Sequence, residues 1–180
     1  MGKEAPSPLR YQLNLFKRDM IKIRKAKETD FEDIWDIFHQ IVKRGDTFAF
    51  DPEAPKEDCR TLWMSSSVHT YVAEFQNKIL GTYILRKNQP GLGAHVANAA
   101  YMVHPEARWQ GIGKAMGSQS IKQAKKQGFS AIQFNFVVST NIVAIQLWLK
   151  LGFKIVGTVP KAFNHQKLGF VDIYIMHRFV

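Results

Sequence analysis

Cysteine is almost absent from this 180-residue chain, which excludes an internal disulfide. Cys59 has no second thiol to pair with, and a protein without disulfides is typical of a reducing compartment. The first residues also lack the apolar segment of a secretory signal. We therefore expect a cytoplasmic protein in which Cys59 is a structural residue.

Long hydrophobic runs are lacking too. No stretch approaches the roughly 20 apolar residues that cross a bilayer, so we expect no membrane association. Lysine and arginine outnumber acidic residues by 25 to 15, a formal charge of +10, but they are spread along the chain without the basic and aromatic motifs of nucleic-acid-binding modules. We expect no nucleic-acid partner, because a positive field suits a polyanionic cosubstrate equally well.

Two common nucleotide-binding motifs are missing, the Gly-Lys-Ser/Thr of P-loops and the G-x-G-x-x-G of dinucleotide folds. Instead, an apolar run at 96–103 leads into Arg108-x-x-Gly111-x-Gly113, and a helical pattern follows to Gln127. Glycines allow a tight turn and close approach of a ligand, and a helix start offers unpaired N–H groups and a positive dipole end. The stretch predicts a phosphate site, although an ordinary strand-to-helix turn has the same pattern.

The turn is part of the first of two sequence motifs. They are Val103-x-Pro105-x-x-Arg108-x-x-Gly111-x-Gly113 and Asn141-x-x-Ala144-x-x-x-Trp148-x-x-x-Gly152-Phe153. In this order they resemble the GCN5-related N-acetyltransferase (GNAT) superfamily, over roughly 21–180. The resemblance implies an α/β fold with a mixed, mostly antiparallel sheet of six to seven strands flanked by helices. Its fourth and fifth strands are parallel and splay apart.

The residue patterns agree with one domain at 20–180 after a tail at 1–19. Period-two and period-3.6 patterns predict strands at 21–24, 69–75, 79–86, 94–103, 132–138, 153–159 and 170–178, and helices at about 30–41, 55–64, 112–127 and 141–151. The first helix has an apolar stripe, Ile34, Ile37, Phe38 and Ile41, and the third has a side of small residues, Gly113, Gly117, Ser120 and Ala124, that lets it lie close to the sheet. Gly128 is expected to end the third helix, and alternation places Ile132, Phe134, Phe136 and Val138 on one face of the fifth strand.

The resemblance further implies acetyl-CoA as cosubstrate, with no metal. Its pyrophosphate would be bound by backbone N–H groups of Gln110, Gly111, Ile112, Gly113 and Lys114. Arg108 would add charge, unless it forms a surface salt bridge. The pantetheine arm would pair with 101–103, where the N–H of Met102 or Val103 is the candidate donor to the oxyanion.

Three asparagines stand out as candidate site residues. Asn141 suits a helix N-cap, and by the resemblance it also binds CoA. Asn98 and Asn135 lie inside strands, where asparagine is disfavoured; each either satisfies a bulge or a buried water, or serves function. A narrower resemblance, to the yeast acetyltransferases of azetidine-2-carboxylate and related proline analogues, assigns Asn98 and Asn135 to the acceptor, and Asn135 and Asn141 to catalysis.

Trp148 departs from the family pattern. Many members have a tyrosine here, which protonates the departing thiolate, and an indole N–H cannot do so. Trp148 is therefore expected to pack beside the cofactor. No clear general base is present, but Tyr101, with His95 and His104, lies on or near the fourth strand.

The acceptor is the least defined part of the prediction. In the family, the segment after the first helix forms a wall of the acceptor site, so Thr47 and Phe48 either line a small pocket or close the core. We expect an N-acetyltransferase of a small amine, such as a free amino acid or analogue. A peptide or protein acetyltransferase and a non-catalytic CoA-binding regulator are the alternatives. Dimers are common in the family, so a homodimer is a further expectation.

Overall fold

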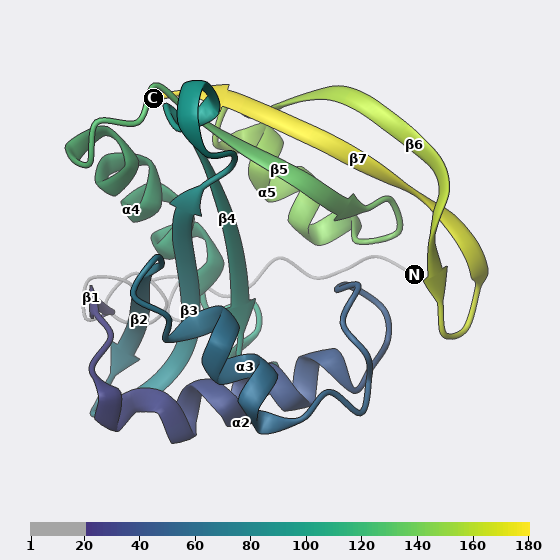
Figure 1. Cartoon of the computed structure of the whole chain (residues 1–180). Coiled ribbons are helices and arrows are strands. Elements are labelled where there is room, and N and C mark those ends of the chain that lie inside the picture. The colour runs from purple at the N-terminus through teal and green to yellow at the C-terminus, as the bar shows by residue number, and fades with distance from the viewer. Residues whose placement is uncertain (1–20) are drawn as a thin grey trace, which may run out of the picture.

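The computed structural model describes residues 21–180, and the predicted tail at 1–19 lies outside them. One seven-stranded sheet, in the order β1-β2-β3-β4-β5-β7-β6, forms the centre of the fold (Figure 1). Its strands are β1 (Lys22–Lys25), β2 (His69–Phe75), β3 (Lys78–Lys87), β4 (Val96–Val103), β5 (Ala131–Val138), β6 (Lys154–His165) and β7 (Gly169–Phe179). The helices are α2 (Phe31–Val42), α3 (Lys56–Trp63), α4 (Ile112–Lys126) and α5 (Ile142–Lys150), and three short 3-10 turns are η1 (Glu28–Asp30), η2 (Gly91–Gly93) and η3 (Pro105–Ala107). The predicted α/β class, with a mixed and mostly antiparallel sheet, is confirmed.

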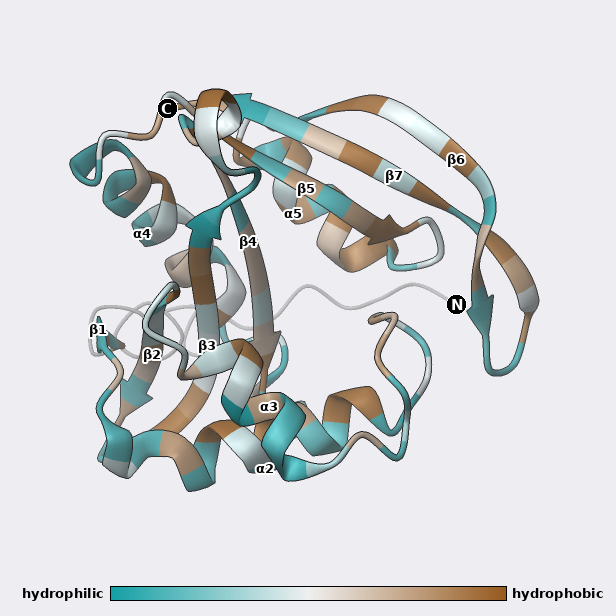
Figure 2. Ribbon diagram, viewed as in Figure 1, coloured by the Kyte–Doolittle hydropathy of each residue, from teal (hydrophilic) through white to brown (hydrophobic). Residues whose placement is uncertain are grey.

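The helices cover the two faces of the sheet. On one face, α2 buries Ile34, Ile37, Phe38 and Ile41, the predicted apolar stripe, and packs with α3 against β3 and β4. On the other face, α4 and α5 enclose a second core with the inner side chains of β2 to β5. Figure 2 shows hydrophobic stretches in the strands and also on α2 and α5, while α4 carries more hydrophilic residues. Among the described helices, none is both long and apolar enough to cross a membrane.

Small residues let α4 approach its neighbours closely. A Cβ added at Gly117 would lie 2.5 Å from Leu151 Cδ1 and 2.9 Å from Trp148 Cζ3, so this glycine faces α5. The predicted small-residue side of α4 therefore serves contact with a helix as well as with the sheet. Gly128, with φ of +81°, follows the helix end as predicted.

The sheet divides in its middle. The parallel strands β4 and β5 pair only through Val96, Ala97 and Asn98 with Ala131, Ile132 and Gln133. Beyond these residues the two strands diverge, as Figure 1 shows between their labels. We call the opening beyond Asn98 and Gln133 the fork. The predicted splayed pair is confirmed.

Two details of the strands differ from the prediction. The pairing of β5 with β7 shifts register between Phe134 and Val137, so Phe136 is 40% exposed and does not share the buried face predicted for it. A bulge breaks the alternation on which that prediction depended. The last hairpin is also longer than predicted, because β6 continues to His165.

Candidate functional site

The turn between β4 and α4 has the geometry of an anion site. Gly111 precedes the helix with a left-handed φ of +83°, a conformation that favours glycine. The first helical bond of the turn runs from Ala115 N–H to Gly111 O, which leaves the N–H groups of Ile112, Gly113 and Lys114 without an intrahelical acceptor. No acidic residue lies in this first helical turn. Three of the five predicted backbone donors, those of Ile112, Gly113 and Lys114, thus lie at the positive end of a 15-residue helix.

Arg108 and Gln110 flank these donors. Burial and the neighbouring Arg44 lower the pKa of the Arg108 guanidinium, and Asp46 opposes that shift. Arg108 therefore lies toward the α2–α3 loop, where an anion would meet two cations and one carboxylate. Gln110 Nε2 donates to Glu106 O at 3.4 Å, which folds that side chain back onto η3.

Strand alternation decides which backbone groups of β4 face the fork. His104 N–H donates to Leu80 O and Asn88 N–H to Val96 O, and β3 and β4 pair between these bonds without a register shift. The even-numbered residues of β4, Met102 included, therefore direct their backbone groups toward β3. Beyond the last β4–β5 pair, Tyr101 and Val103 direct theirs into the fork. This alternation favours Val103 over Met102 as the predicted backbone donor.

The side chain of Tyr101 points into the core under α4 and α5. Its hydroxyl lies 2.7 Å from Ser120 Oγ, and Ser120 in turn donates to Gly117 O. Burial raises the pKa of the Tyr101 phenol, only partly offset by the Ser120 hydrogen bond. A phenol in this position is a poor source or acceptor of protons at neutral pH.

Trp148 packs against this tyrosine. Their ring centroids are 4.6 Å apart, and the centroid of Phe134, on the opposite arm of the fork, is 4.8 Å from that of Trp148. Trp148 is buried. It therefore fills the floor of the fork between its two arms.

The two strand asparagines lie on the opposite side of the fork. Asn98 Nδ2 donates to Gln133 O at 3.0 Å, which adds a side-chain bond at the point where the strands separate. Gln133 Nε2 donates to Asn135 Oδ1 at 2.9 Å, and Asn135 Nδ2 donates to Asn88 Oδ1 at 2.7 Å. Met102 shares a face of β4 with Asn98 and packs with α2 and α3. Asn98 is the Cα partner of Gln133, and Asn135 follows Gln133 by two residues, so all three amides lie on the α2/α3 face of the sheet.

The sequence did not identify Asn88 or Gln133 as candidate site residues. Asn88 follows β3 and Gln133 lies among apolar residues of β5, and neither position carries a motif. Only the strand pairing shows that a loop residue after β3 reaches a bulge in β5. No local signal in the sequence could have revealed it.

The other predicted site residues, Asn141, Thr47 and Phe48, have structural contacts. Asn141 Oδ1 accepts from Ala144 N–H at 3.3 Å, the N-cap that the pattern predicts for α5. Phe48 stacks on Phe50 with centroids 5.8 Å apart, Phe50 in turn packs on Phe38, and Thr47 is half-buried beside them. Phe48 thus contributes to the α2/α3 core.

The α2–α3 loop meets the tip of the last hairpin. Gln166 N–H donates to Gly45 O at 3.0 Å, which joins two segments far apart in the sequence. The fork is therefore bordered on its α2/α3 side by the 43–55 loop and by the β6–β7 hairpin.

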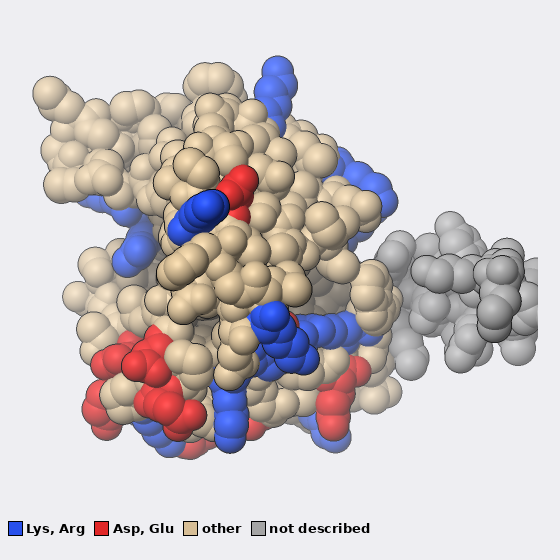
Figure 3. All heavy atoms as spheres, turned by 90° about the vertical axis from the view of Figure 1, so that its right-hand side faces the viewer, with Lys and Arg blue, Asp and Glu red and all other residues tan. Residues whose placement is uncertain are grey.

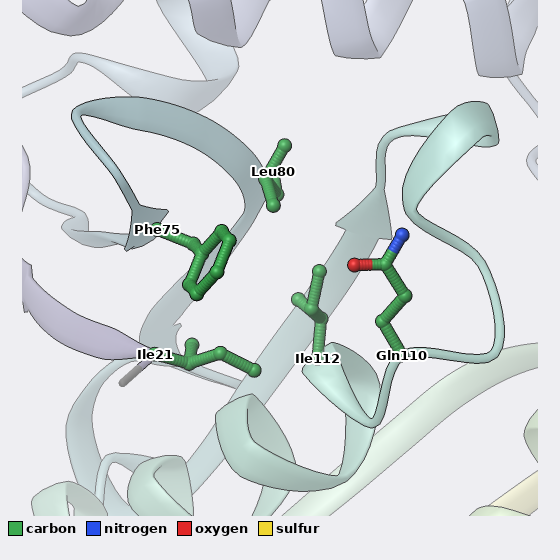
Figure 4. A pocket seen from close by; sticks show the side chains of 5 residues that line it. All are labelled: Ile21, Phe75, Leu80, Gln110 and Ile112. Atoms are coloured by element: carbon green, nitrogen blue, oxygen red, sulfur yellow. The ribbon is translucent and has the colours of Figure 1, made fainter. Parts of the chain in front are cut away.

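Two surface hollows lie elsewhere. One, shown in Figure 4, is an apolar hollow with no room for a water molecule. It is lined by Ile21, Phe75, Leu80, Gln110 and Ile112. The other lies between the end of α5 and the β6–β7 hairpin, near Lys154 and His177. Within residues 21–180, no group of three or more His, Cys, Asp or Glu side chains is placed to hold a metal ion.

The sequence is similar to a known protein family and to a curated relative. The profile of the acetyltransferase (GNAT) family matches residues 31–153. N-acetyltransferase aca1 of Schizosaccharomyces pombe is 33% identical over 105 residues, which cover 57% of this chain and 49% of that protein. The chain thus spans about half the length of this relative.

Solved structures share the whole fold. A GCN5-related N-acetyltransferase from Kribbella flavida is 43% identical, with a TM-score of 0.87 over 91% of this chain and 99% of that one. A phosphinothricin acetyltransferase from Sinorhizobium meliloti, in complex with acetyl-CoA, has a TM-score of 0.79 over 89% of both chains, but at 20% identity this shows the fold alone. None of these three is named for azetidine-2-carboxylate, so the narrower resemblance stays a prediction.

The family match runs from the first residue of α2 to Phe153, just before β6. It therefore takes in the turn before α4, the fork and both helices beneath it. The chain belongs to the acetyltransferase (GNAT) family.

Proposed function

We propose that this protein transfers the acetyl group of acetyl-CoA to the amine of a small molecule, a free amino acid or an amino-acid analogue. The observation that carries the proposal is the fork, which leaves backbone groups of β4 unpaired next to a helix start with free N–H groups. A ligand with a diphosphate at one end and amides along its arm fits both features, and acetyl-CoA is such a ligand.

The turn before α4 would hold the pyrophosphate. The N–H groups of Ile112, Gly113 and Lys114 point to the anion, and Arg108 adds charge at its edge. The pantetheine arm would lie along Tyr101 and Val103 in place of the missing strand, with Val103 N–H in reach of the thioester oxygen. A backbone donor in this position stabilises the oxyanion that forms during attack.

The reaction needs little from side-chain acids. The amine attacks the thioester carbon, the C–N bond forms, the C–S bond breaks, and the amine proton passes to solvent. CoA leaves as a thiolate, which is tolerable near neutral pH because thiol pKa values lie near 8.5. Trp148 in the usual tyrosine position is compatible with this route, and its place on the fork floor keeps water from the thioester.

Charge on the α2/α3 face supports an acceptor with a carboxylate. Arg86 is the Cα partner of Asn98 across β3 and β4, so both side chains lie on the same face of the sheet. Arg86 is exposed and belongs to none of the six ion pairs of the described residues. A guanidinium beside amides binds a carboxylate well, which favours an amino acid over a simple amine.

The opposite requirement, a long basic surface for nucleic acid, is not favoured by the charge distribution. On the face shown in Figure 3, lysine and arginine side chains form several separate groups, and acidic side chains lie among and beside them. This face therefore does not present one continuous basic surface of the kind that a polyanion would need.

Thiol release tests the proposal. The full chain is incubated with acetyl-CoA and, separately, with each common amino acid, with azetidine-2-carboxylate, with amines that lack a carboxylate, and with a short peptide. We expect thiol release with amino acids or the analogue only. Release only with the peptide would support a peptide acetyltransferase, and tight CoA binding without release from any acceptor would refute catalysis.

We also propose that two copies of the chain associate through β6. This strand is the edge of the sheet, and its Ile155, Val156 and Val159 are 41%, 60% and 41% exposed. An apolar edge strand readily pairs with a second strand. Sedimentation should show a concentration-dependent dimer that Val156→Lys weakens, and a chain that remains monomeric at every concentration contradicts this assembly.

A further inference from the structure

Asn135 lies in the middle of a directed row of side-chain amides. Gln133 donates into its oxygen at 2.9 Å, and its own nitrogen donates to Asn88 at 2.7 Å. One hydrogen and one lone pair of the Asn135 amide therefore remain free. The two neighbours determine which edge of the amide carries the oxygen.

The ladder between β5 and β7 is interrupted next to Asn135. It shifts register between Phe134 and Val137, and bulges of this kind are common next to functional sites. Asn135 is exposed and Asn88 half-exposed, so each bond competes with water and adds little to stability. The row of amides therefore contributes little to the stability of the fold.

We propose that Asn88 and Gln133 are positioning residues that hold the Asn135 amide in one orientation toward the acceptor. The inference rests on the proposed function, with the acceptor amine placed at Asn135, two residues beyond the last β4–β5 pair and on the same face as Asn98 and Arg86. An attacking amine must aim its lone pair at the thioester carbon, which requires its N–H to be held elsewhere. The free lone pair of Asn135 Oδ1 accepts that N–H, provided that the amide cannot turn over.

Truncation of either neighbour tests the positioning role. Asn88→Ala and Gln133→Ala should each lower kcat/KM for the acceptor about tenfold, with the KM for acetyl-CoA and the Tm unchanged. Gln146→Ala, an exposed amide on α5, is the matched control and should change nothing. Unchanged acceptor kinetics in Asn88→Ala and Gln133→Ala overturn the inference.

Isosteric exchange of amide for acid tests the direction of the row. Asn88 only accepts, so Asn88→Asp keeps the bond and should retain activity within about twofold. Gln133 donates, so Gln133→Glu removes the donor and should lose about tenfold, because a carboxylate forces the Asn135 amide to turn over. Both substitutions add one negative charge at the same surface, so equal losses would show a charge effect and overturn the inference.

A readout without turnover separates this inference from the proposed function. The hydrogen-bonded side-chain N–H of Asn135, assigned through Asn135→Ala, should lose its downfield ¹H shift in Asn88→Ala and Gln133→Glu and should keep it in Asn88→Asp, where a carboxylate accepts the same bond. If the wild-type protein releases no thiol with any acceptor, the proposed function fails while these shifts still report on the row. If thiol is released but Asn88→Ala and Gln133→Glu leave the Asn135 signals unchanged, Asn88 and Gln133 do not fix the orientation of the Asn135 amide.

Discussion

The contact between α4 and α5 at Gly117 permits a prediction in which two known effects oppose each other. Gly117 is buried in mid-helix, where alanine normally improves a helix by about 1 kcal/mol over glycine. The added methyl, however, would lie 2.5 Å from Leu151 Cδ1 and 2.9 Å from Trp148 Cζ3. Real Cβ contacts are longer than 3 Å, so a neighbouring side chain or one of the two helices must shift.

The clash should outweigh the propensity gain. Leu151 can turn away, but the Trp148 ring is held against Tyr101 and Phe134, with centroids 4.6 Å and 4.8 Å away. Overpacking of this kind costs about 1–3 kcal/mol. We therefore expect Gly117→Ala to destabilise the protein by about 1 kcal/mol net, a fall in Tm of about 2–4 °C for a chain of this size.

Urea unfolding followed by tryptophan fluorescence measures the change. Gly113→Ala is the matched comparison, because its added methyl lies 3.3 Å from the flexible end of Leu147, and it should unfold within about 0.5 kcal/mol of the wild type. A Gly117→Ala protein that is more stable than the wild type, at an unchanged m-value, would refute the close packing of α4 on α5.

Four further predictions concern separate parts of the molecule. Gly111→Glu should abolish CoA binding, measured by calorimetry, while the protein stays folded. The reason is that Gly111 lies at the phosphate turn with a left-handed φ of +83°, where a carboxylate side chain would repel the pyrophosphate. A CoA affinity within about threefold of the wild type would contradict the turn as the phosphate site. Arg86→Gln should raise the acceptor KM about tenfold and leave simple amines unaffected. The hydrogen bond from Arg24 lowers the pKa of the Asp30 carboxyl. The charged carboxylate therefore contributes about 1–3 kcal/mol to the free energy of unfolding above the ordinary carboxyl pKa, and this contribution is lost as the pH falls through the lowered pKa. Asp30→Asn should make the free energy of unfolding fall less steeply below about pH 4. Burial raises the pKa of the Cys59 thiol to about 12, so a thiol reagent at pH 7 should label it only in urea, and rapid native labelling would contradict its burial.

Much of the fold was accessible from the sequence because its signals are local. The α2 stripe, the Asn141 cap and the glycines at 111 and 128 each report on their own few residues, and the structure confirms all of them. The parallel pair at β4 and β5 followed from the resemblance. The bulge after Phe134 has no local signal, since the residues on both sides of it read as a regular strand.

The amide row, by contrast, depends on a contact between distant segments. Gln133 and Asn135 keep the alternation of a regular strand, so their side chains lie on one face and share a 2.9 Å bond. Their partner Asn88 comes from the loop after β3 and accepts from Asn135 at 2.7 Å, a contact that no local pattern reveals. Residue types alone therefore indicated that Asn135 required an explanation, but only the three-dimensional pairing supplied one.

The fork itself shows why a cosubstrate fits this fold so readily. Where β5 leaves β4, Tyr101 and Val103 retain backbone groups that a continuing strand would have paired, and unpaired backbone in a partly buried gap is unfavourable. Trp148 and Phe134 fill the floor of the gap with apolar rings, so the strands cannot close without expelling them from the core. An extended ligand with its own amides restores the missing ladder without moving either strand. The unpaired backbone of β4 thus favours binding of the arm of acetyl-CoA, and the free N–H groups of the turn before α4 determine the direction in which the ligand lies along the strand.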